Sequence, residues 1–328
     1  MSASVCRGGE RKATAPTTKV QVAELSPQAE QAIERGLRYL AAKQNRNGSW
    51  GDRHHVAITS LSLMAFMLKG HFPKTGPHGP ALEKALGFLL KRADEGAGYL
   101  GTHNQGMYEH GLATLALSEV WGMSDHKKIR DALKRAVDVI LRAQNRDGGW
   151  RYHPRPVDAD ISVTVMQVVA LASAAEAGIL VPDEVIKKAL AYVKRCQHRF
   201  DGGFGYQPGN TPRFSSSAAG LMSLLMCGER GTKPVERGLS YLKRLPEGKF
   251  QKERWYLYGH YYAIQAMYQA GESHYKAWYP HIRDALLAKQ KKDGSWTSPS
   301  GEGDPCYGTA MAILILGVPY RFLPIYQR

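Results

Sequence analysis

The sequence predicts an all-α protein, a single domain in which six helical hairpins close into one ring. Three observations lead to this fold class. A glycine–aromatic turn recurs along the chain, an amphipathic segment precedes each clear turn, and a segment that is apolar on nearly every side follows it. The chain has 328 residues, of which 43% are hydrophobic and 22% charged, a composition typical of a globular protein with a substantial core.

The turn is clearest as Gln-x-x-x-Gly-x-Trp, which occurs at residues 44–50, 144–150 and 290–296. A version that is one residue longer ends at Phe204, and two degenerate turns end at Tyr99 and Phe250. The six aromatic positions, 50, 99, 150, 204, 250 and 296, are 46 to 54 residues apart. Self-similarity at a nearly fixed period indicates a repeat architecture, so we expect six repeats of about 50 residues.

Each repeat contains two kinds of helix. Before the turn at residue 150, for example, Ile129, Leu133, Ala136 and Ile140 recur at helical spacing with charged residues between them, which predicts a helix with one solvated face. The segments 56–68, 161–175, 218–227 and 307–316 have no polar face and must therefore be buried. Six outer and six inner helices make two concentric layers, and we expect the inner layer to surround a central apolar cavity.

The turn residues have structural roles in this scheme. Glycine allows the chain to reverse where an outer helix ends. Tryptophan offers a large apolar surface and an N–H group that needs an acceptor. The glutamine lies at the end of the outer helix, where it can bond to backbone groups that the helix leaves unpaired.

The N-terminal residues indicate where the domain begins, and the cysteines indicate the cellular compartment. Residues 1–26 are polar and lack the apolar run of a signal peptide, so we expect a disordered N-terminal arm followed by one domain over residues 27–328. The cysteines, Cys6, Cys196, Cys227 and Cys306, are scattered without metal-type spacing and are expected to be reduced thiols. A cytoplasmic protein is the expectation, with peripheral membrane attachment or an exported mature form left open.

The chain is basic, with a formal net charge of +15 and 44 lysines and arginines against 29 acidic residues. Such a surface attracts anions, including an acidic membrane surface. The basic residues form no dense run, and the sequence contains no zinc knuckle, recognition-helix motif or aromatic RNA-binding signature. We therefore expect no specific nucleic-acid partner.

The repeated Gln-x-x-x-Gly-x-Trp motif (QW motif) resembles that of the terpenoid cyclase and protein prenyltransferase superfamily, in particular squalene-cyclase-type repeat proteins. The resemblance covers residues 28 to 316. It implies an α/α toroid, a six-hairpin α6–α6 barrel, with chemistry at one mouth and an isoprenoid or other apolar small molecule as the ligand. Because one fold hosts many functions, the activity must be argued from the site.

Asp158 and Asp160 open the third inner helix, soon after the turn that ends at Trp150. Type II terpene cyclases carry Asp-x-Asp-Asp in a similar place, so the resemblance implies that Asp160 is the catalytic acid and Asp158 its partner. An acid that protonates carbon must be kept protonated by burial and a neighbouring carboxylate. Ile161 replaces the third aspartate, which leaves catalytic competence open. Asp160 is also a suitable helix N-cap.

Asp304 and Cys306 open the sixth inner helix as Asp-Pro-Cys-Tyr. Protein prenyltransferases use Asp-x-Cys-Tyr for two zinc ligands, and ring closure would bring His54 or His55 near as the third. In that family the histidine follows this segment, whereas here it precedes it. Zinc is therefore the alternative to a protein without a cofactor. Asp304 also suits a helix cap, and Cys306 suits a core.

The fifth inner helix is rich in aromatic residues. Trp255, Tyr258 and Tyr262 fall on one helical face, and cyclases resemble this in lining their cavities with aromatic rings, whose faces stabilise cations. We expect these three residues, together with His260 and Tyr307, to line the ligand cavity. Core packing is the alternative explanation of such a stripe.

Three functions remain open at this point. The first is a terpene cyclase-like enzyme that binds an isoprenoid and starts cyclisation by proton transfer, with a homodimer or a helical partner domain completing its cavity. The second is a zinc-dependent prenyltransferase-like subunit, and the third a non-catalytic toroid that binds a lipid, a peptide or a protein. Glu109 and His110 are a further acid/base candidate. The QW motifs argue against a polysaccharide-acting toroid, and an open α-solenoid is the architectural alternative.

Overall fold

The computed structural model describes residues 25–102, 106–123, 127–245, 255–298 and 303–320. The predicted N-terminal arm therefore lies outside the described residues, apart from residues 25 and 26. Within these ranges there are twelve α-helices and one short 3-10 helix, and no extended strand. The all-α prediction is confirmed.

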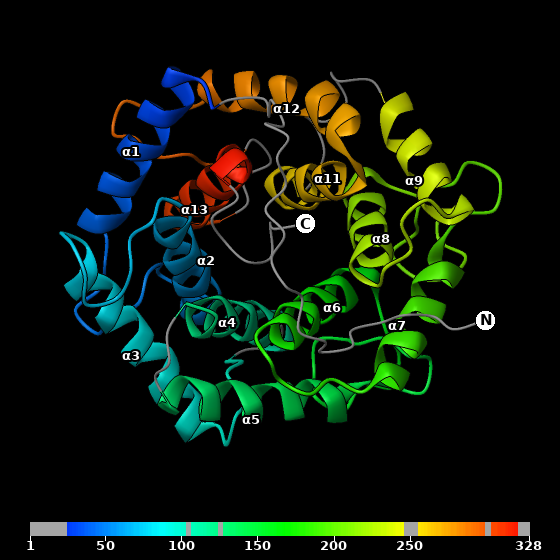
Figure 1. Cartoon of the computed structure of the whole chain (residues 1–328), viewed down its shortest axis with the longest axis horizontal. Helices are drawn as coiled ribbons and strands as arrows, with labels where there is room; N and C mark the ends of the chain where they lie inside the picture. Colours follow the sequence, from blue (N-terminus) through cyan, green and yellow to red (C-terminus); the bar gives the residue numbers. More distant parts are fainter. Residues whose placement is uncertain (1–24, 103–105, 124–126, 246–254, 299–302, 321–328) are drawn as a thin grey trace, which may run out of the picture.

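The helices form two concentric layers (Figure 1). The outer helices are α1 (Pro27–Ala42), α3 (Gly79–Glu95), α5 (Lys127–Ala143), α7 (Asp183–Cys196), α9 (Lys233–Arg244) and α12 (Glu272–Leu287). The inner helices are α2 (His55–Leu68), α4 (Gly106–Trp121), α6 (Ile161–Glu176), α8 (Phe214–Met226), α11 (Tyr256–Ala270) and α13 (Pro305–Leu316), and η1 (Val318–Tyr320) follows them.

The layers differ as their patterns predict. In α2, every residue from Val56 to Leu68 is buried, whereas α5 buries only the apolar stripe that includes Ile129, Leu133 and Ile140. None of the described helices is both long and apolar enough to cross a bilayer.

The ring is closed. The last inner helix, α13, packs against both α1 and α2 at the start of the chain. The side chain of Gln290 donates a hydrogen bond of 2.8 Å from Nε2 to the carbonyl of Ala32 in α1. The same kind of bond joins Gln144 to Val185 between consecutive repeats. Repeat six therefore meets repeat one by the same bond that joins repeat three to repeat four, which excludes the open solenoid.

At the four turns that carry a motif glutamine, a fixed set of hydrogen bonds holds one repeat to the next. Each motif glutamine donates from Nε2 to the carbonyl of its turn glycine and to a carbonyl near the start of the next outer helix. The glutamines are Gln44, Gln144, Gln197 and Gln290. The indoles of Trp50, Trp150 and Trp296 are buried and donate from Nε1 to carbonyls at the end of the preceding outer helix.

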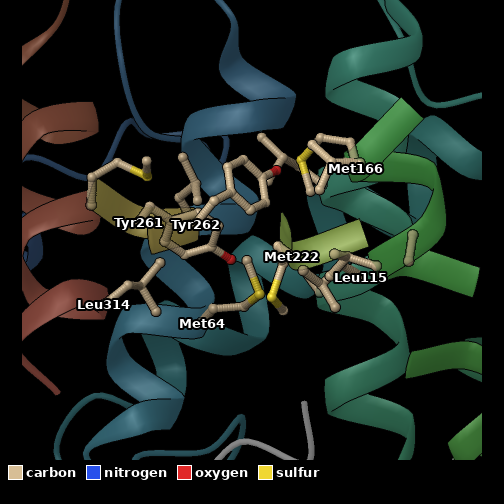
Figure 2. Close-up of a cluster of buried hydrophobic side chains, with 14 of the residues drawn as sticks. Met64, Leu115, Met166, Met222, Tyr261, Tyr262 and Leu314 are labelled. Carbon is tan, nitrogen blue, oxygen red and sulfur yellow. The ribbon is translucent and has the colours of Figure 1, made fainter. Parts of the chain in front are cut away.

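The centre of the ring differs from the expected open cavity. Figure 2 shows side chains from all six inner helices pointing toward one another, and each labelled one is at most 2% exposed. They include Met64, Leu115, Met166, Met222, Tyr262 and Leu314. Unbranched methionine side chains fill irregular space. At this level the centre is packed with the protein's own side chains.

Candidate functional site at the mouth of the ring

Every hairpin runs from an outer to an inner helix, so the N-termini of the six inner helices lie on one rim, which we call the mouth. The residues that immediately precede the inner helices include His54, Asp160, Trp255 and Asp304. The positive ends of the inner-helix dipoles therefore converge here. Nearly all the residues that the sequence singled out lie at this mouth.

Asp160 is fully buried and caps α6. Its Oδ1 atom accepts hydrogen bonds from the backbone N–H groups of Ser162 at 2.8 Å and Val163 at 2.9 Å. The backbone of Asp160 donates to the carbonyl of Trp150 at 3.0 Å, which fixes the loop to the turn motif. The predicted cap is confirmed, and it uses only one of the two carboxyl oxygens.

The other oxygen of Asp160, Oδ2, accepts no hydrogen bond from the described residues. Burial raises the pKa of this carboxyl above its usual range, since a charge is costly away from water. The donors at Ser162 and Val163, the Tyr206 phenol and the charge of Arg151 act in the opposite direction. Burial outweighs them.

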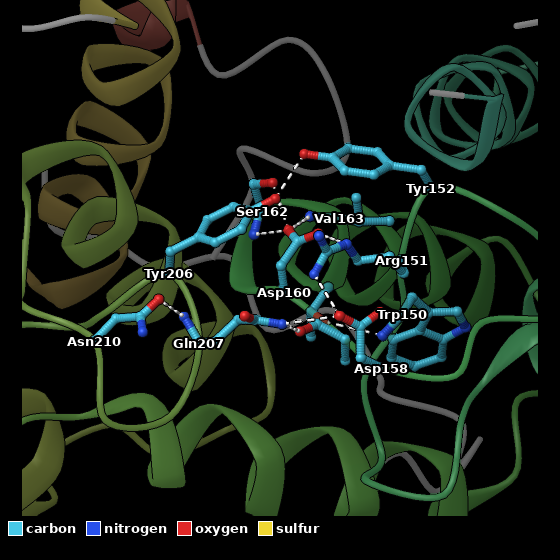
Figure 3. Close-up of polar contacts among 12 residues, drawn as sticks. Trp150, Arg151, Tyr152, Asp158, Asp160, Ser162, Val163, Tyr206, Gln207 and Asn210 are labelled. Atoms are coloured by element: carbon cyan, nitrogen blue, oxygen red, sulfur yellow. Dashed lines mark hydrogen bonds and ion pairs between the residues drawn. The ribbon is translucent and has the colours of Figure 1, made fainter. Parts of the chain in front are cut away.

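Arg151 lies between the two aspartates (Figure 3). Its Nη1 atom is 2.8 Å from Oδ2 of Asp158, and its Nε atom is 3.3 Å from Oδ2 of Asp160. The guanidinium also lies over the rings of Tyr152 and Tyr206, with its central carbon 5.3 Å and 5.7 Å from the ring centroids. The structure thus brings the two predicted aspartates together, but through a cation that the sequence did not indicate.

Two loops meet over Asp160. The hydroxyl groups of Tyr152 and Tyr206 share a hydrogen bond of 2.6 Å. Gln207 donates from Nε2 to Oδ2 of Asp158 at 3.2 Å and to the carbonyl of Ala159 at 2.8 Å. The loops that enter α6 and α8 are therefore joined above the buried carboxyl.

Tyrosines of α4 and α11 form a row of rings that reaches from this site to Tyr262 in the packed centre. The rings of Tyr108 and Tyr258 have centroids 6.2 Å apart, and those of Tyr258 and Tyr262 are 4.9 Å apart with edge-to-face geometry. Burial raises the pKa of each of these three phenols well above its ordinary value. Tyr108 and Tyr307 keep part of their surface exposed, so solvent reaches this wall.

The predicted aromatic stripe begins later than expected. Trp255 precedes α11 with a left-handed backbone, φ 72°, and its side chain is 47% exposed. A residue in that conformation is outside the helical period, so Trp255 does not continue the face of Tyr258 and Tyr262. His260 is buried against Phe214 and Tyr256, and burial lowers its pKa to about 3.

His54 and Glu109 form a pair that sequence reasoning missed. The Nδ1 atom of His54 is 2.9 Å from Oε1 of Glu109, which is 1% exposed. Thr102 donates its backbone N–H to the other carboxyl oxygen at 2.8 Å. His54 has φ 50°, a conformation unusual for a residue other than glycine. The two residues belong to neighbouring repeats, and no local signal in the sequence joins them.

His110, which the sequence grouped with Glu109, has different partners. Its Nδ1 accepts from the backbone N–H of Leu100 at 3.2 Å, and its Nε2 is 3.0 Å from the carbonyl of Ala136. Both ring nitrogens are thus used in holding adjacent segments together. His110 is fully buried.

The residues named for zinc do not converge. Asp304 accepts the backbone N–H of Cys306 at 2.7 Å as the cap of α13 and that of Asp52 at 2.7 Å. His54 is engaged with Glu109. Within the described ranges, no group of three His, Cys, Asp or Glu side chains is placed to hold a metal ion. These residues, including His55, do not fit a zinc site.

The same toroid occurs in solved structures of two kinds of enzyme. A variant of the type II terpene cyclase MstE from Scytonema, in complex with its substrate geranylgeranyl dihydroxybenzoate, is 17% identical, with a TM-score of 0.62 over 90% of this chain and 98% of that one. An inactive variant of an α-1,6-mannanase of Salegentibacter, in complex with α-1,6-mannotriose, is 8% identical, with a TM-score of 0.64 over 90% of this chain and 99% of that one. At such identities the likeness shows the fold alone.

A comparison with curated protein sequences finds no match. The model of one protein family, described as the prenyltransferase alpha-alpha toroid domain, matches residues 25–245 and 181–319. These overlapping matches span the repeats from the first outer helix to the end of the ring. The chain therefore belongs to the prenyltransferase alpha-alpha toroid domain family.

Proposed function

We propose that the chain binds an isoprenoid-type ligand at the mouth of its ring and protonates it from Asp160, as an enzyme of the type II terpene cyclase kind. The observation that carries this proposal is that the two carboxyl oxygens of Asp160 have different hydrogen-bond partners. Oδ1 anchors the carboxyl to the start of α6, while Oδ2 accepts no hydrogen bond from the described residues and lies beside the tyrosines of the mouth.

The proposed step is a proton transfer from oxygen to carbon. The π electron pair of a terminal alkene takes the proton from Oδ2, which forms a C–H bond, leaves Asp160 as a carboxylate and places a carbocation on the ligand. Such a transfer needs a carboxylic acid that is protonated at working pH, and the burial that raises the pKa of Asp160 supplies this bias. After cyclisation the cation loses a proton to water at the partly exposed Tyr152 and Tyr206, which leaves a neutral alkene, and that water returns a proton to the Asp160 carboxylate.

The tyrosine wall suits the carbocation. Tyr108, Tyr258 and Tyr262 present aromatic rings from α4 and α11, and the negative faces of such rings stabilise cations. Their raised pKa values keep the phenols neutral, so the rings neither donate protons readily nor carry a charge that would trap the cation. Apolar side chains such as Met166 and Leu314 close the floor.

One toroid is enough for this proposal. The MstE chain, which is described as binding geranylgeranyl dihydroxybenzoate, aligns with this single ring over 98% of its length. A homodimer or a helical partner domain is thus not needed to account for the mouth.

The three buried cysteines among the described residues, Cys196, Cys227 and Cys306, are free thiols, in keeping with the proposed cytoplasmic location.

The proposal is tested by Asp160→Asn with geraniol, farnesol, geranylgeraniol and squalene as probes. Asparagine caps a helix about as well as aspartate, so the fold is kept while the acid is lost. We expect cyclised products, detected by gas chromatography with mass spectrometry, from the unchanged protein and none from the variant at an equal melting temperature. Equal turnover by both proteins would remove Asp160 from the reaction.

Asp304→Asn is the matched control, because Asp304 caps α13 as Asp160 caps α6. Under the acid proposal it leaves product formation unchanged. Under the zinc alternative no protein forms cyclised products from these probes, and Asp304→Asn removes the zinc that metal analysis finds in the unchanged protein. The two variants therefore separate the two chemistries.

A second candidate function is a non-catalytic ring that binds a lipid, a peptide or a protein at its mouth. The packed centre favours it, because side chains of all six inner helices fill the interior and leave only the rim for a ligand. It predicts that prenyl alcohols quench tryptophan fluorescence with the same affinity in the unchanged protein and in Asp160→Asn, without any product from either.

A further inference from the structure

The aspartate that the sequence pairs with the acid has a different set of contacts from the acid itself. Asp158 has a side chain that is 49% exposed, whereas Asp160 is 0% exposed. Water solvates a charge on the first, while a charge on the second carries the full cost of burial. Both face the same guanidinium, that of Arg151, so the arrangement of this one cation decides which carboxylate it stabilises.

Arg151 donates its side-chain hydrogen bond to Asp158 and not to Asp160. The 2.8 Å contact from Nη1 to Asp158 satisfies hydrogen-bond geometry, whereas the 3.3 Å contact from Nε to Asp160 does not. A charge-assisted hydrogen bond is about twice as strong as a neutral one, so this difference in geometry matters. Gln207 holds Asp158 from its other side by donating to the same oxygen at 3.2 Å.

Arg151 also has little freedom to leave. Its guanidinium packs against the rings of Tyr152 and Tyr206, and the hydroxyl groups of these residues are joined at 2.6 Å. If Asp158 lost its charge, the carboxyl of Asp160 would be the acceptor already within 3.3 Å. A modest rotation of the guanidinium would then turn the contact into a hydrogen bond.

Among the described residues, Arg151 is the cation that lies within 4 Å of the Asp160 carboxyl. The groups whose interaction with this carboxyl is resolved include the phenols of Tyr206, Tyr192 and Tyr258, the thiol of Cys196 and the guanidinium of Arg151. Asp158 shares the same guanidinium. Burial raises the pKa of the Cys196 thiol to about 12, so this neighbour is neutral. Arg151 is thus the cation that can ionise Asp160.

We propose that Asp158 is a positioning residue that takes the hydrogen bond of the Arg151 guanidinium for itself, so that Arg151 donates none to Asp160 and Asp160 remains a proton donor. The inference rests on the proposed function only for the reason that Asp160 should stay protonated. The effect of Asp158 on the titration of Asp160 does not depend on that function. It assigns Asp158 a role different from that of a second acid: it neutralises the cation at the mouth. Gln207 supports it by fixing the Asp158 carboxyl in place.

The test is the titration of Asp160 in protein labelled with ¹³C at the aspartate carboxyl carbon, followed by NMR. Asp160→Asn identifies the resonance. In Asp158→Asn, Arg151 turns to Asp160, and we expect the midpoint of the Asp160 titration to fall by about 1 to 3 pH units, the usual effect of an opposite charge within 4–6 Å. An unchanged midpoint overturns the proposal.

The double variant Asp158→Asn with Arg151→Gln shows whether the fall acts through the guanidinium. We expect it to return the midpoint to the starting value or above it, and a midpoint that stays low contradicts the proposal. Asp94→Asn is the matched control, because it breaks the exposed ion pair of Asp94 with Arg135 on the outer layer. It should leave the Asp160 titration unchanged.

Turnover gives an independent readout. If the protein cyclises prenyl substrates, Asp158→Asn moves the high-pH limb of the rate profile to lower pH, since Asp160 loses its proton earlier. If titration responds as expected but no protein forms products, the proposed function fails while the role of Asp158 stands. If products form but the Asp160 titration does not respond to Asp158→Asn, the proposed function stands and the role of Asp158 is contradicted.

Discussion

The indole Nε1 of Trp150 donates a hydrogen bond of 2.8 Å to the carbonyl of Ile140, in the last turn of the outer helix α5. The backbone N–H of the same tryptophan donates to the hydroxyl of Thr164, in the first turn of the inner helix α6, at 3.1 Å. One side chain and its own backbone thus connect the end of one helix to the start of the next. Thr59 and Thr309 play the part of Thr164 in other repeats.

Trp150→Phe should lower the free energy of unfolding by about 1–3 kcal/mol, since it leaves the carbonyl of Ile140 buried without its side-chain donor. Denaturation by urea measures the loss. Trp296→Phe is expected to give a similar value, because Trp296 donates to the carbonyl of Leu286 at 2.8 Å in the same geometry. A stability within 0.3 kcal/mol of the unchanged protein, roughly the scatter of additive measurements, would show that packing alone explains the tryptophan.

Ring closure predicts that the two ends of the chain are energetically equivalent to any internal junction. Gln290→Leu removes the hydrogen bonds to Ala32 and Gly294, and Gln144→Leu removes their counterparts at Val185 and Gly148. We expect both variants to lose about 1–3 kcal/mol in urea denaturation. A ring that is open in solution would lose less stability with Gln290→Leu than with Gln144→Leu, because only the local hydrogen bond to Gly294 would remain to be removed.

The fold was predictable from the sequence because its signals are local and periodic. The glutamine, glycine and tryptophan of each turn recur at fixed spacing, and the burial of segments such as 56–68 follows from the absence of a polar face. The filled centre was not predictable. Whether Met64 and Met222 meet across the axis depends on the ring radius and on rotamers, which no local pattern encodes.

The site was predictable only in part. Asp160 and Asp158 were found because they open an inner helix after a recognisable turn, and the cap of Asp160 followed from its position. Arg151 has no motif of its own, and its role arises from the meeting of two loops at Tyr152 and Tyr206. The His54–Glu109 pair likewise depends on contact between neighbouring repeats. Contacts between repeats decide the chemistry, whereas the periodic pattern within repeats decides the fold.

Two separate features of a turn can require glycine: a left-handed backbone conformation, and a neighbouring backbone that leaves no room for a Cβ atom. Gly148 has φ 90°, and a Cβ added there would lie 2.3 Å from the carbonyl oxygen of Lys188 in the next outer helix. Gly178 has φ 80°, but a Cβ there would meet nothing within 4 Å. We expect Gly178→Ala to cost about 1–2 kcal/mol for left-handed strain. Gly148→Ala adds overpacking, for about 2–5 kcal/mol in total, and equal losses in urea denaturation would contradict this reading.

Acid should destabilise the ring through His110. Burial lowers the pKa of this histidine from 6.5 to about 4, since a charged imidazole would be desolvated and its Nδ1 could no longer accept from Leu100. The unfolded chain therefore binds a proton that the folded chain does not between about pH 6.5 and pH 4. Stability is then fully present above pH 6.5 and falls as the pH drops through this window, by up to about 1.4 kcal/mol per pH unit for one group.

The measurement is the free energy of unfolding of the unchanged protein and of His110→Gln between pH 4 and pH 8. Glutamine keeps a donor and an acceptor but does not titrate, so the variant should lose stability less steeply on acidification. His260, whose pKa burial lowers to about 3, adds a second proton to the slope that remains. If the slopes of the two proteins coincide, His110 is protonated in the folded ring as readily as in the unfolded chain, and its hydrogen bond from Leu100 cannot be what holds the second turn to α4.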